Sequence, residues 1–245
     1  MDGKNVVIVG GAGGLGAATA KLMAERGASA LAIIDVVREQ TDAVVADLNA
    51  LGCQAIGLVG DVALAAPAQE IFGQAASQLG AVHSMVNCAG LYPRKPILEI
   101  TDDEWTASFD VNVRCTHNMM VAAVEHMRAS GNGGRIVNIS SVDAFKPHPK
   151  NSHYAAMKAA VTSLTKSFAL EFAPDQILIN SVAPAGIATE KAKAAGFVPE
   201  LEAQTPLGRA ATPEDIAEMI VFLASSRNRY TTGENVIVGG GYVMH

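Results

Sequence analysis

A tyrosine and a lysine stand four residues apart in the stretch NSHYAAMK, residues 151–158. If this stretch is helical, the spacing brings Tyr154 and Lys158 onto the same face. A free phenol has a pKa of about 10 and is a poor base at neutral pH, but a nearby ammonium favours its ionised form. The two residues are therefore either surface neighbours on a helix or a phenol prepared for proton transfer.

A second group of residues has the pattern of a loop that binds a pyrophosphate. The stretch VGGAGGLG, residues 9–16, places Gly10, Gly14 and Gly16 between an expected strand and an expected helix. Glycines let the backbone turn tightly and approach the phosphates, which face the helix N-terminus. Asp35 ends the next expected strand, where a carboxylate can accept hydrogen bonds from ribose hydroxyls. The alternative is a tight turn followed by a solvated aspartate.

Further polar residues follow the third and fourth expected strands. Asp61 comes after the third, and NCAG, from Asn87 to Gly90, comes after the fourth. Each is also an ordinary turn residue. Because open α/β sheets bind ligands beyond the carboxyl ends of their strands, we expect these residues to line one edge together.

Short apolar runs alternate with longer helical patterns along the whole chain. The runs expected as strands are 5–10, 31–35, 54–59, 84–87, 135–140, 177–183 and 235–238, and the expected helices are 14–26, 38–51, 66–79, 102–129, 152–172 and 213–224. Continuously apolar strands separated by helices predict an α/β fold, a Rossmann-like, doubly wound parallel sheet of about seven strands with helices on both faces. We expect one domain, residues 1–245, with a substrate lid near 188–206.

Composition limits the kinds of partner. The chain is 49% hydrophobic with a formal net charge of -6, which argues against disorder and against a nucleic-acid partner. No apolar run approaches the length of a membrane span. The three cysteines and six histidines show no metal-ligand spacing, so no metal is expected. The sequence predicts a cytoplasmic protein.

These motifs, taken in order, resemble the classical short-chain dehydrogenase/reductase family. GxxxGxG, NCAG, Asn112 in DVNV, Ser141 in NISS, YxxxK and NSVAPAG occur with the family's order and spacing over nearly the whole chain. The resemblance implies a catalytic tetrad of Asn112, Ser141, Tyr154 and Lys158. In it Tyr154 is the general acid and base, Ser141 hydrogen-bonds the reacting oxygen, and Asn112 interrupts its helix and orders a water.

The resemblance also implies a nicotinamide cofactor. We expect NAD(H) rather than NADP(H), because the Asp35 carboxylate would repel a 2′-phosphate. Lys158 would hold the nicotinamide ribose, and the PAGIAT stretch would seat the carboxamide. The residues expected to bind the cofactor are Gly10, Gly14, Leu15, Gly16, Asp35, Asp61, Val62, Asn87, Ala89, Gly90, Tyr154, Lys158, Pro184, Ile187 and Thr189.

By the same resemblance, polar residues lie among those that wall the substrate pocket. The residues expected to contact substrate are Tyr92, Asp143, His148, Asn151 and Gly186. A polar group buried without a partner costs about 1–3 kcal/mol, so these groups either face water at the pocket mouth or bond the substrate. We favour a small secondary alcohol or ketone with further oxygen functions, cyclic compounds included, over a long acyl chain.

The predicted function is therefore hydride transfer between a secondary alcohol or ketone and NAD(H). Two alternatives stay open: a 3-oxoacyl-(acyl-carrier-protein) reductase, and a non-catalytic NAD(H)-binding sensor. Apolar residues on several faces of the helices at 102–129 and 152–172, among them Met119, Met120, Val161 and Leu164, together with the family resemblance, predict a homotetramer.

Overall fold

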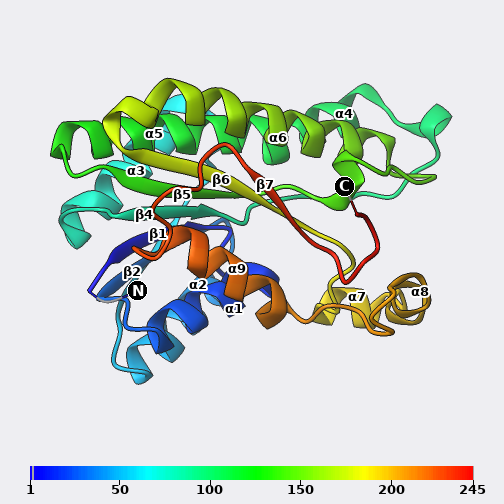
Figure 1. Ribbon diagram of the computed structural model, residues 1–245, viewed down its shortest axis with the longest axis horizontal. Helices are drawn as coiled ribbons and strands as arrows, with labels where there is room; N and C mark the ends of the chain where they lie inside the picture. The colour runs from blue at the N-terminus through cyan, green and yellow to red at the C-terminus, as the bar shows by residue number, and fades with distance from the viewer. Residues whose placement is uncertain (2, 245) are drawn as a thin grey trace.

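The computed structural model describes residue 1 and residues 3–244. The expected domain, 1–245, also includes Asp2 and His245, which lie outside the described residues. Among the described residues, seven strands form one parallel sheet in the order β3-β2-β1-β4-β5-β6-β7 (Figure 1). The strands are β1 Asn5–Val9, β2 Ala30–Asp35, β3 Gln54–Val59, β4 Ser84–Asn87, β5 Gly134–Ile139, β6 Ile177–Pro184 and β7 Asn235–Val238.

Helices cover both faces of this sheet, as predicted. Figure 1 shows α5 and α6 on one side and α1, α2 and α9 on the other. The helices are α1 Gly14–Glu25, α2 Arg38–Ala50, α3 Ala65–Leu79, α4 Asp102–Phe109, α5 Cys115–Ser130, α6 Ser152–Phe172, α7 Glu190–Ala194, α8 Val198–Gln204 and α9 Pro213–Ala224. The predicted α/β class and doubly wound architecture are confirmed.

Two hydrophobic cores explain why the strands are apolar throughout. In β1, Val7 and Val9 belong to the core beneath α3 and α5, whereas Val6 and Ile8 belong to the core beneath α1 and α9. Successive side chains of a strand point to opposite faces. Because both faces are buried, neither set can be polar.

The strand order reverses between β1 and β4, and this reversal determines where a ligand can enter. β1 pairs with β2 on one side and with β4 on the other, where Val9 lies opposite Asn87. The connections after these two strands leave in opposite directions, which opens a crevice beyond their carboxyl ends. The glycine loop and the NCAG stretch meet there.

Two segments differ from the elements expected. The helix predicted over 102–129 is divided into α4 and α5 by a π-helical turn at Asp110–Arg114, which contains Asn112. The expectation that Asn112 breaks the helix is confirmed. The segment expected as an irregular lid, 188–206, forms the short helices α7 and α8. No helix in the part of the chain that the structure describes is both long and apolar enough to cross a membrane.

The start of α4 generates a stability prediction. Thr101 Oγ1 accepts a hydrogen bond from Glu104 N (3.3 Å), and a Glu104 carboxylate oxygen accepts one from Thr101 N (2.9 Å). Thr101→Ala removes this capping box, so we expect the free energy of unfolding in urea to fall by about 1 kcal/mol. The control is Ser167→Ala on the exposed side of α6, which should change it by less than about 0.5 kcal/mol. Equal losses in both variants would contradict the capping role.

Candidate active site

The glycine loop is packed too closely for side chains. Gly10 has φ +68°, and a Cβ there would lie 2.5 Å from Ala89 N; a Cβ on Gly16 would lie 2.0 Å from Gly10 O. Gly13, the residue before α1, has no side chain to cap the helix. The first amide groups of α1 are therefore left for another acceptor. A loop with this shape and these free donors fits a pyrophosphate.

Asp35 is fixed beside this loop by backbone donors. One carboxylate oxygen accepts a hydrogen bond from Ala12 N (3.0 Å), and the other accepts one from Val36 N (2.7 Å). The oxygen that accepts from Val36 N also accepts a longer bond from Val37 N (3.4 Å), so the oxygen facing Ala12 N is the one that retains a free lone pair. The carboxylate is thus oriented at the end of β2, where it can accept hydrogen bonds from the hydroxyls of a ribose.

The polar side chains after β3 and β4 shape turns. Asp61 Oδ1 accepts a hydrogen bond from Ala63 N (2.9 Å). Asn87 Oδ1 accepts one from Ala89 N (3.2 Å), and Asn87 Nδ2 donates to Thr116 Oγ1 (2.7 Å). These contacts match the turn role that sequence left open for Asp61 and Asn87, and they place the backbone at Ala89 against Gly10.

Asn112 ties the π-helical turn to the loop after β4. Its side chain is fully buried; Nδ2 donates to Leu91 O (3.0 Å) and Ser108 O (2.9 Å), and Oδ1 accepts from Leu91 N (3.3 Å). The side chain therefore competes with the helical hydrogen bonds of its own backbone. The residue both interrupts the helix and fixes the wall next to Gly90.

Ser141, Tyr154 and Lys158 converge on one cavity. Ser141 Oγ accepts a hydrogen bond from Asp143 N (3.1 Å) at the end of β5 and is also hydrogen-bonded with Tyr154. Lys158 Nζ donates to Ile139 O (2.8 Å) and lies 5.6 Å from the centre of the Tyr154 ring. The expected one-face placement of the tyrosine and lysine on α6 is confirmed.

Burial shifts the pKa values of both α6 residues away from their charged forms. It raises the pKa of the Tyr154 phenol, and Asp143 and Tyr92 raise it further, while the hydrogen bond with Ser141 lowers it. Burial lowers the pKa of the Lys158 ammonium to about 8. Desolvation is the largest cause of the upward shift of the Tyr154 pKa, and Lys158 is not among the groups that shift it. The expectation that positive charge beside the phenol favours its ionised form stays a prediction.

The cavity has a volume of about 1900 Å³, larger than a typical site for one small ligand. It has room for a dinucleotide and a second molecule. The expected residues that line it are Gly14, Gly90, Tyr92, Ser141, Asp143, His148, Tyr154, Lys158, Pro184, Gly186, Ile187 and Thr189. The expected residues that are not among those lining it are Gly10, Leu15, Gly16, Asp35, Asp61, Val62, Asn87, Ala89, Asn112 and Asn151.

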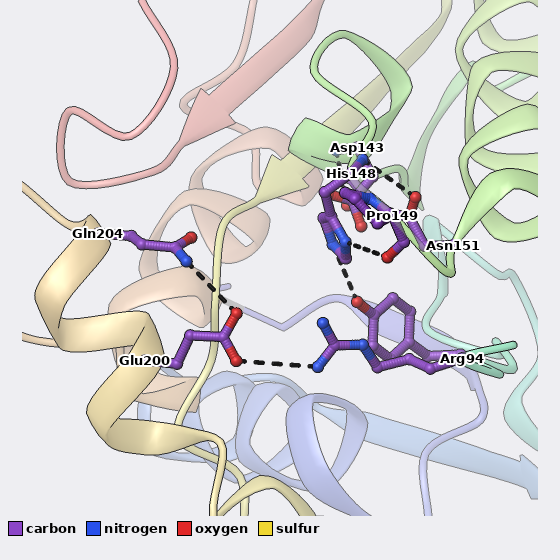
Figure 2. A network of polar contacts seen from close by, with 9 residues as sticks. Arg94, Asp143, His148, Pro149, Asn151, Glu200 and Gln204 are labelled. Atoms are coloured by element: carbon purple, nitrogen blue, oxygen red, sulfur yellow. Dashed lines mark hydrogen bonds and ion pairs between the residues drawn. The ribbon is translucent and has the colours of Figure 1, made fainter. Parts of the chain in front are cut away.

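Asn151 does not line the cavity. It is fully buried, and its Oδ1 accepts a hydrogen bond from His148 N (3.1 Å) (Figure 2). Asn151 therefore holds the loop that carries His148. His148 itself lines the cavity, and its Nε2 is 3.2 Å from the Tyr92 hydroxyl. The Tyr92 ring packs edge-on against Tyr154, with 4.5 Å between ring centres.

Two residues outside the lid, Arg94 and Tyr242, also line the cavity, and sequence reasoning missed both. Arg94, on the loop after β4, lies 4.9 Å above the Phe197 ring and 4.0 Å from a Glu200 carboxylate oxygen (Figure 2). Tyr242, near the C-terminus, also lines the cavity. These residues lie in segments without periodicity, and no spacing in the sequence connects them. At Gly186, a Cβ would approach the lid residue Leu201 to 2.4 Å.

Comparison with known proteins gives the family. Residues 10–243 match a family model described as enoyl-(acyl carrier protein) reductase. The chain is 37% identical to L-rhamnose 1-dehydrogenase (NAD(P)(+)) of a Sphingomonas species, over 100% of this chain and 98% of that protein. It is 33% identical to the 3-oxoacyl-(acyl-carrier-protein) reductase of Thermotoga maritima, over 100% and 99%.

Solved structures agree with these sequence matches. A short-chain type dehydrogenase/reductase from Mycobacterium marinum superposes with a TM-score of 0.94 at 31% identity, covering 100% of this chain and 97% of the other. A gluconate 5-dehydrogenase from Burkholderia cenocepacia, in complex with NADP and tartrate, gives 0.92 at 32% identity, covering 99% and 96%. With the doubly wound sheet, these full-length similarities show that the chain belongs to the short-chain dehydrogenase/reductase family of oxidoreductases.

Proposed function

We propose that the protein transfers hydride between a secondary alcohol or ketone and NAD(H), with Tyr154 exchanging the proton of the reacting oxygen. The observation that carries this proposal is the convergence of Ser141, Tyr154 and Lys158 on a cavity that also reaches Gly14 of the glycine loop. A bound nicotinamide would supply the hydride acceptor or donor and, when oxidised, a positive charge near the phenol.

The raised pKa of Tyr154 determines its role in the proposed proton transfer. At neutral pH the phenol keeps its proton, so it can donate to the developing alkoxide when a ketone is reduced. Ser141 is positioned to hydrogen-bond the same oxygen. In alcohol oxidation Tyr154 must act as the base, and positive charge beside it stabilises the phenolate.

The residues around the glycine loop fit the cofactor by shape and chemistry. Gly10 and Gly16 leave room for the pyrophosphate, and Asp35 would accept hydrogen bonds from the adenosine ribose. Lys158 has one fixed bond, to Ile139 O, and two further N–H donors for the nicotinamide ribose. Backbone groups from Pro184 through Ile187 to Thr189 would hold the carboxamide; the Thr189 hydroxyl meanwhile accepts from Ala192 N (3.2 Å).

A carrier-protein reductase is the second candidate. It is favoured by the similarity to the Thermotoga reductase and by the description of the matching family model. The net charge of -6 disfavours docking of an acidic carrier protein. Turnover of an acyl thioester with NADPH, in the absence of turnover of simple secondary alcohols, would support this candidate instead.

We also propose that the protein assembles as a homotetramer, but without three of the four residues expected at the contact. Met119, Met120 and Val161 are fully buried within the protomer, so they cannot form a subunit contact, whereas Leu164 is half-buried against the core. The helices retain exposed apolar side chains elsewhere: Trp105 on α4 and Leu170 on α6, the latter 82% exposed. A second copy would cover them.

The proton-transfer role predicts the effect of removing one oxygen. Tyr154→Phe should lower kcat by about 100-fold or more while NADH affinity stays nearly unchanged, because the ring remains and only the acid–base group is lost. The measurements are steady-state kinetics on a panel of secondary alcohols and ketones, and fluorescence titration with NADH. Tyr230→Phe, at a side chain 99% exposed, is the matched control. Near-normal turnover by Tyr154→Phe would rule out this mechanism.

The Asp35 carboxylate predicts a cofactor preference. Wild-type kcat/KM should favour NAD(H) over NADP(H) by about 10- to 1000-fold, because like charges oppose each other in a partly wet site. Asp35→Asn keeps an acceptor for Ala12 N and should reduce this preference; Asp42→Asn, on the exposed side of α2, should leave it unchanged. Comparable kcat/KM values of the wild-type protein with NAD(H) and NADP(H) would contradict the role proposed for Asp35.

The proposed homotetramer predicts the molecular mass of the protein in solution. Light scattering at micromolar concentration should report four protomers. Replacing Leu170 by aspartate should shift the population to smaller species, because it places a charge in an apolar contact. A wild-type monomer under these conditions would contradict the tetramer.

A further inference from the structure

Asp143 presents a carboxylate to the substrate side of the cavity. It lies two residues after Ser141, on a 3₁₀ turn at Val142–Ala144, and its side chain is only 9% exposed. A carboxylate is seldom buried to this degree without full compensation. Asp143 has no place in the proton transfer at Tyr154, so another role must account for it.

The neighbouring histidine does not supply Asp143 with a further donor. His148 Nδ1 lies 3.1 Å from Pro149 O, and a carbonyl only accepts, so Nδ1 carries the proton. In the neutral ring Nε2 is then an acceptor. The Tyr92 hydroxyl, 3.2 Å away, donates to it. Tyr92 keeps this proton at neutral pH, because burial, followed by Asp143, raises its pKa to about 12.

Asp143 nevertheless keeps acceptor capacity on the cavity side. Its Oδ1 lies 3.6 Å from His148 Nε2, beyond hydrogen-bond length, and that nitrogen has no second proton when the ring is neutral. Burial raises the pKa of Asp143, while His148, hydrogen bonds from the Asn151 and Ser141 side chains, and Arg94 oppose the shift. Because a carboxylate can accept about four hydrogen bonds, a hydroxyl entering from the cavity can use the remaining capacity.

The charged side chains around Asp143 limit the charge that a bound substrate can carry. Glu200 lines the same part of the cavity, and Asp143 contributes to raising the pKa values of Tyr92, Tyr154 and Tyr242. The wall is therefore biased against a second anion. Arg94 does not offset this bias fully, since it already contacts the Phe197 ring and Glu200.

We propose that Asp143 accepts a hydrogen bond from a second hydroxyl of the substrate, and that the protein acts on neutral polyhydroxylated compounds in preference to hydroxy acids. The inference rests on the proposed oxidoreductase function and names its substrate class. Similar proteins do not distinguish between these two substrate classes, because one is named for a neutral sugar and another for a carboxylate.

The test compares three compounds of one ring size: cyclohexanol, a vicinal cyclohexanediol and hydroxycyclohexanecarboxylate. The wild-type protein should give the highest kcat/KM with the diol and the lowest with the hydroxy acid. Asp143→Ala should lower kcat/KM for the diol by about 10- to 100-fold, the usual effect of losing a hydrogen bond to a charged group. Its efficiency on cyclohexanol should change little, since that compound has no second hydroxyl.

A conservative variant separates the effect of the Asp143 charge from the effect of its side-chain shape. Asp143→Asn retains the side-chain shape and should raise kcat/KM for the hydroxy acid relative to that for the diol. The reason is that the negative charge opposing the acid is gone. Asp47→Asn, which changes a carboxylate on the α2 side of the same cavity, is the matched control and should leave the ranking unchanged. Thermal unfolding and NADH titration check that each variant is folded.

Two results would overturn the inference while leaving the oxidoreductase function intact. One is a wild-type preference for the hydroxy acid, which would indicate that Arg94 binds an anion. The other is an unchanged ratio of diol to cyclohexanol efficiency in both Asp143 variants. Absence of turnover on every alcohol with either nicotinamide cofactor would overturn the proposed function itself, and this inference with it.

Discussion

Burial of the parallel sheet on both faces is the constraint on which the rest of this structure depends. Because helices cover both cores, polar side chains and free backbone groups gather beyond the carboxyl ends of the strands. The reversal of strand order between β1 and β4 opens that edge into a crevice. The glycine loop, the end of β5 and the start of α6 all meet there, around the cavity of about 1900 Å³.

Close backbone approach gives this crevice its shape. The backbone at Gly10 contacts that at Ala89, and Asn112 joins the loop after β4 to the π-helical turn through two hydrogen bonds with Leu91. The same contacts therefore position both the cofactor side and the substrate side of the cavity. A change at Asn112 would move the wall beside Gly90 as well as the helix that contains it.

Desolvation governs the chemistry within the cavity. It raises the pKa of Tyr154, lowers that of Lys158 to about 8, and raises that of Asp143. Each group is held away from its charged form and responds to whatever charge or donor enters. The same burial thus prepares Tyr154 as a proton donor and favours a further hydrogen bond to the Asp143 carboxylate.

The sequence alone determined the alternation of strands and helices, the glycine loop, and the pairing of Tyr154 with Lys158. These features depend on local periodicity and on spacing within one element, which residue order records directly. The tertiary structure decided that Asn151 supports a loop, that Met119 and Met120 fill the protomer's own core, and that burial raises the pKa of Tyr154. It also brought Arg94 to the lid. Burial and contacts between distant loops have no period in the sequence, so only the folded chain reveals them.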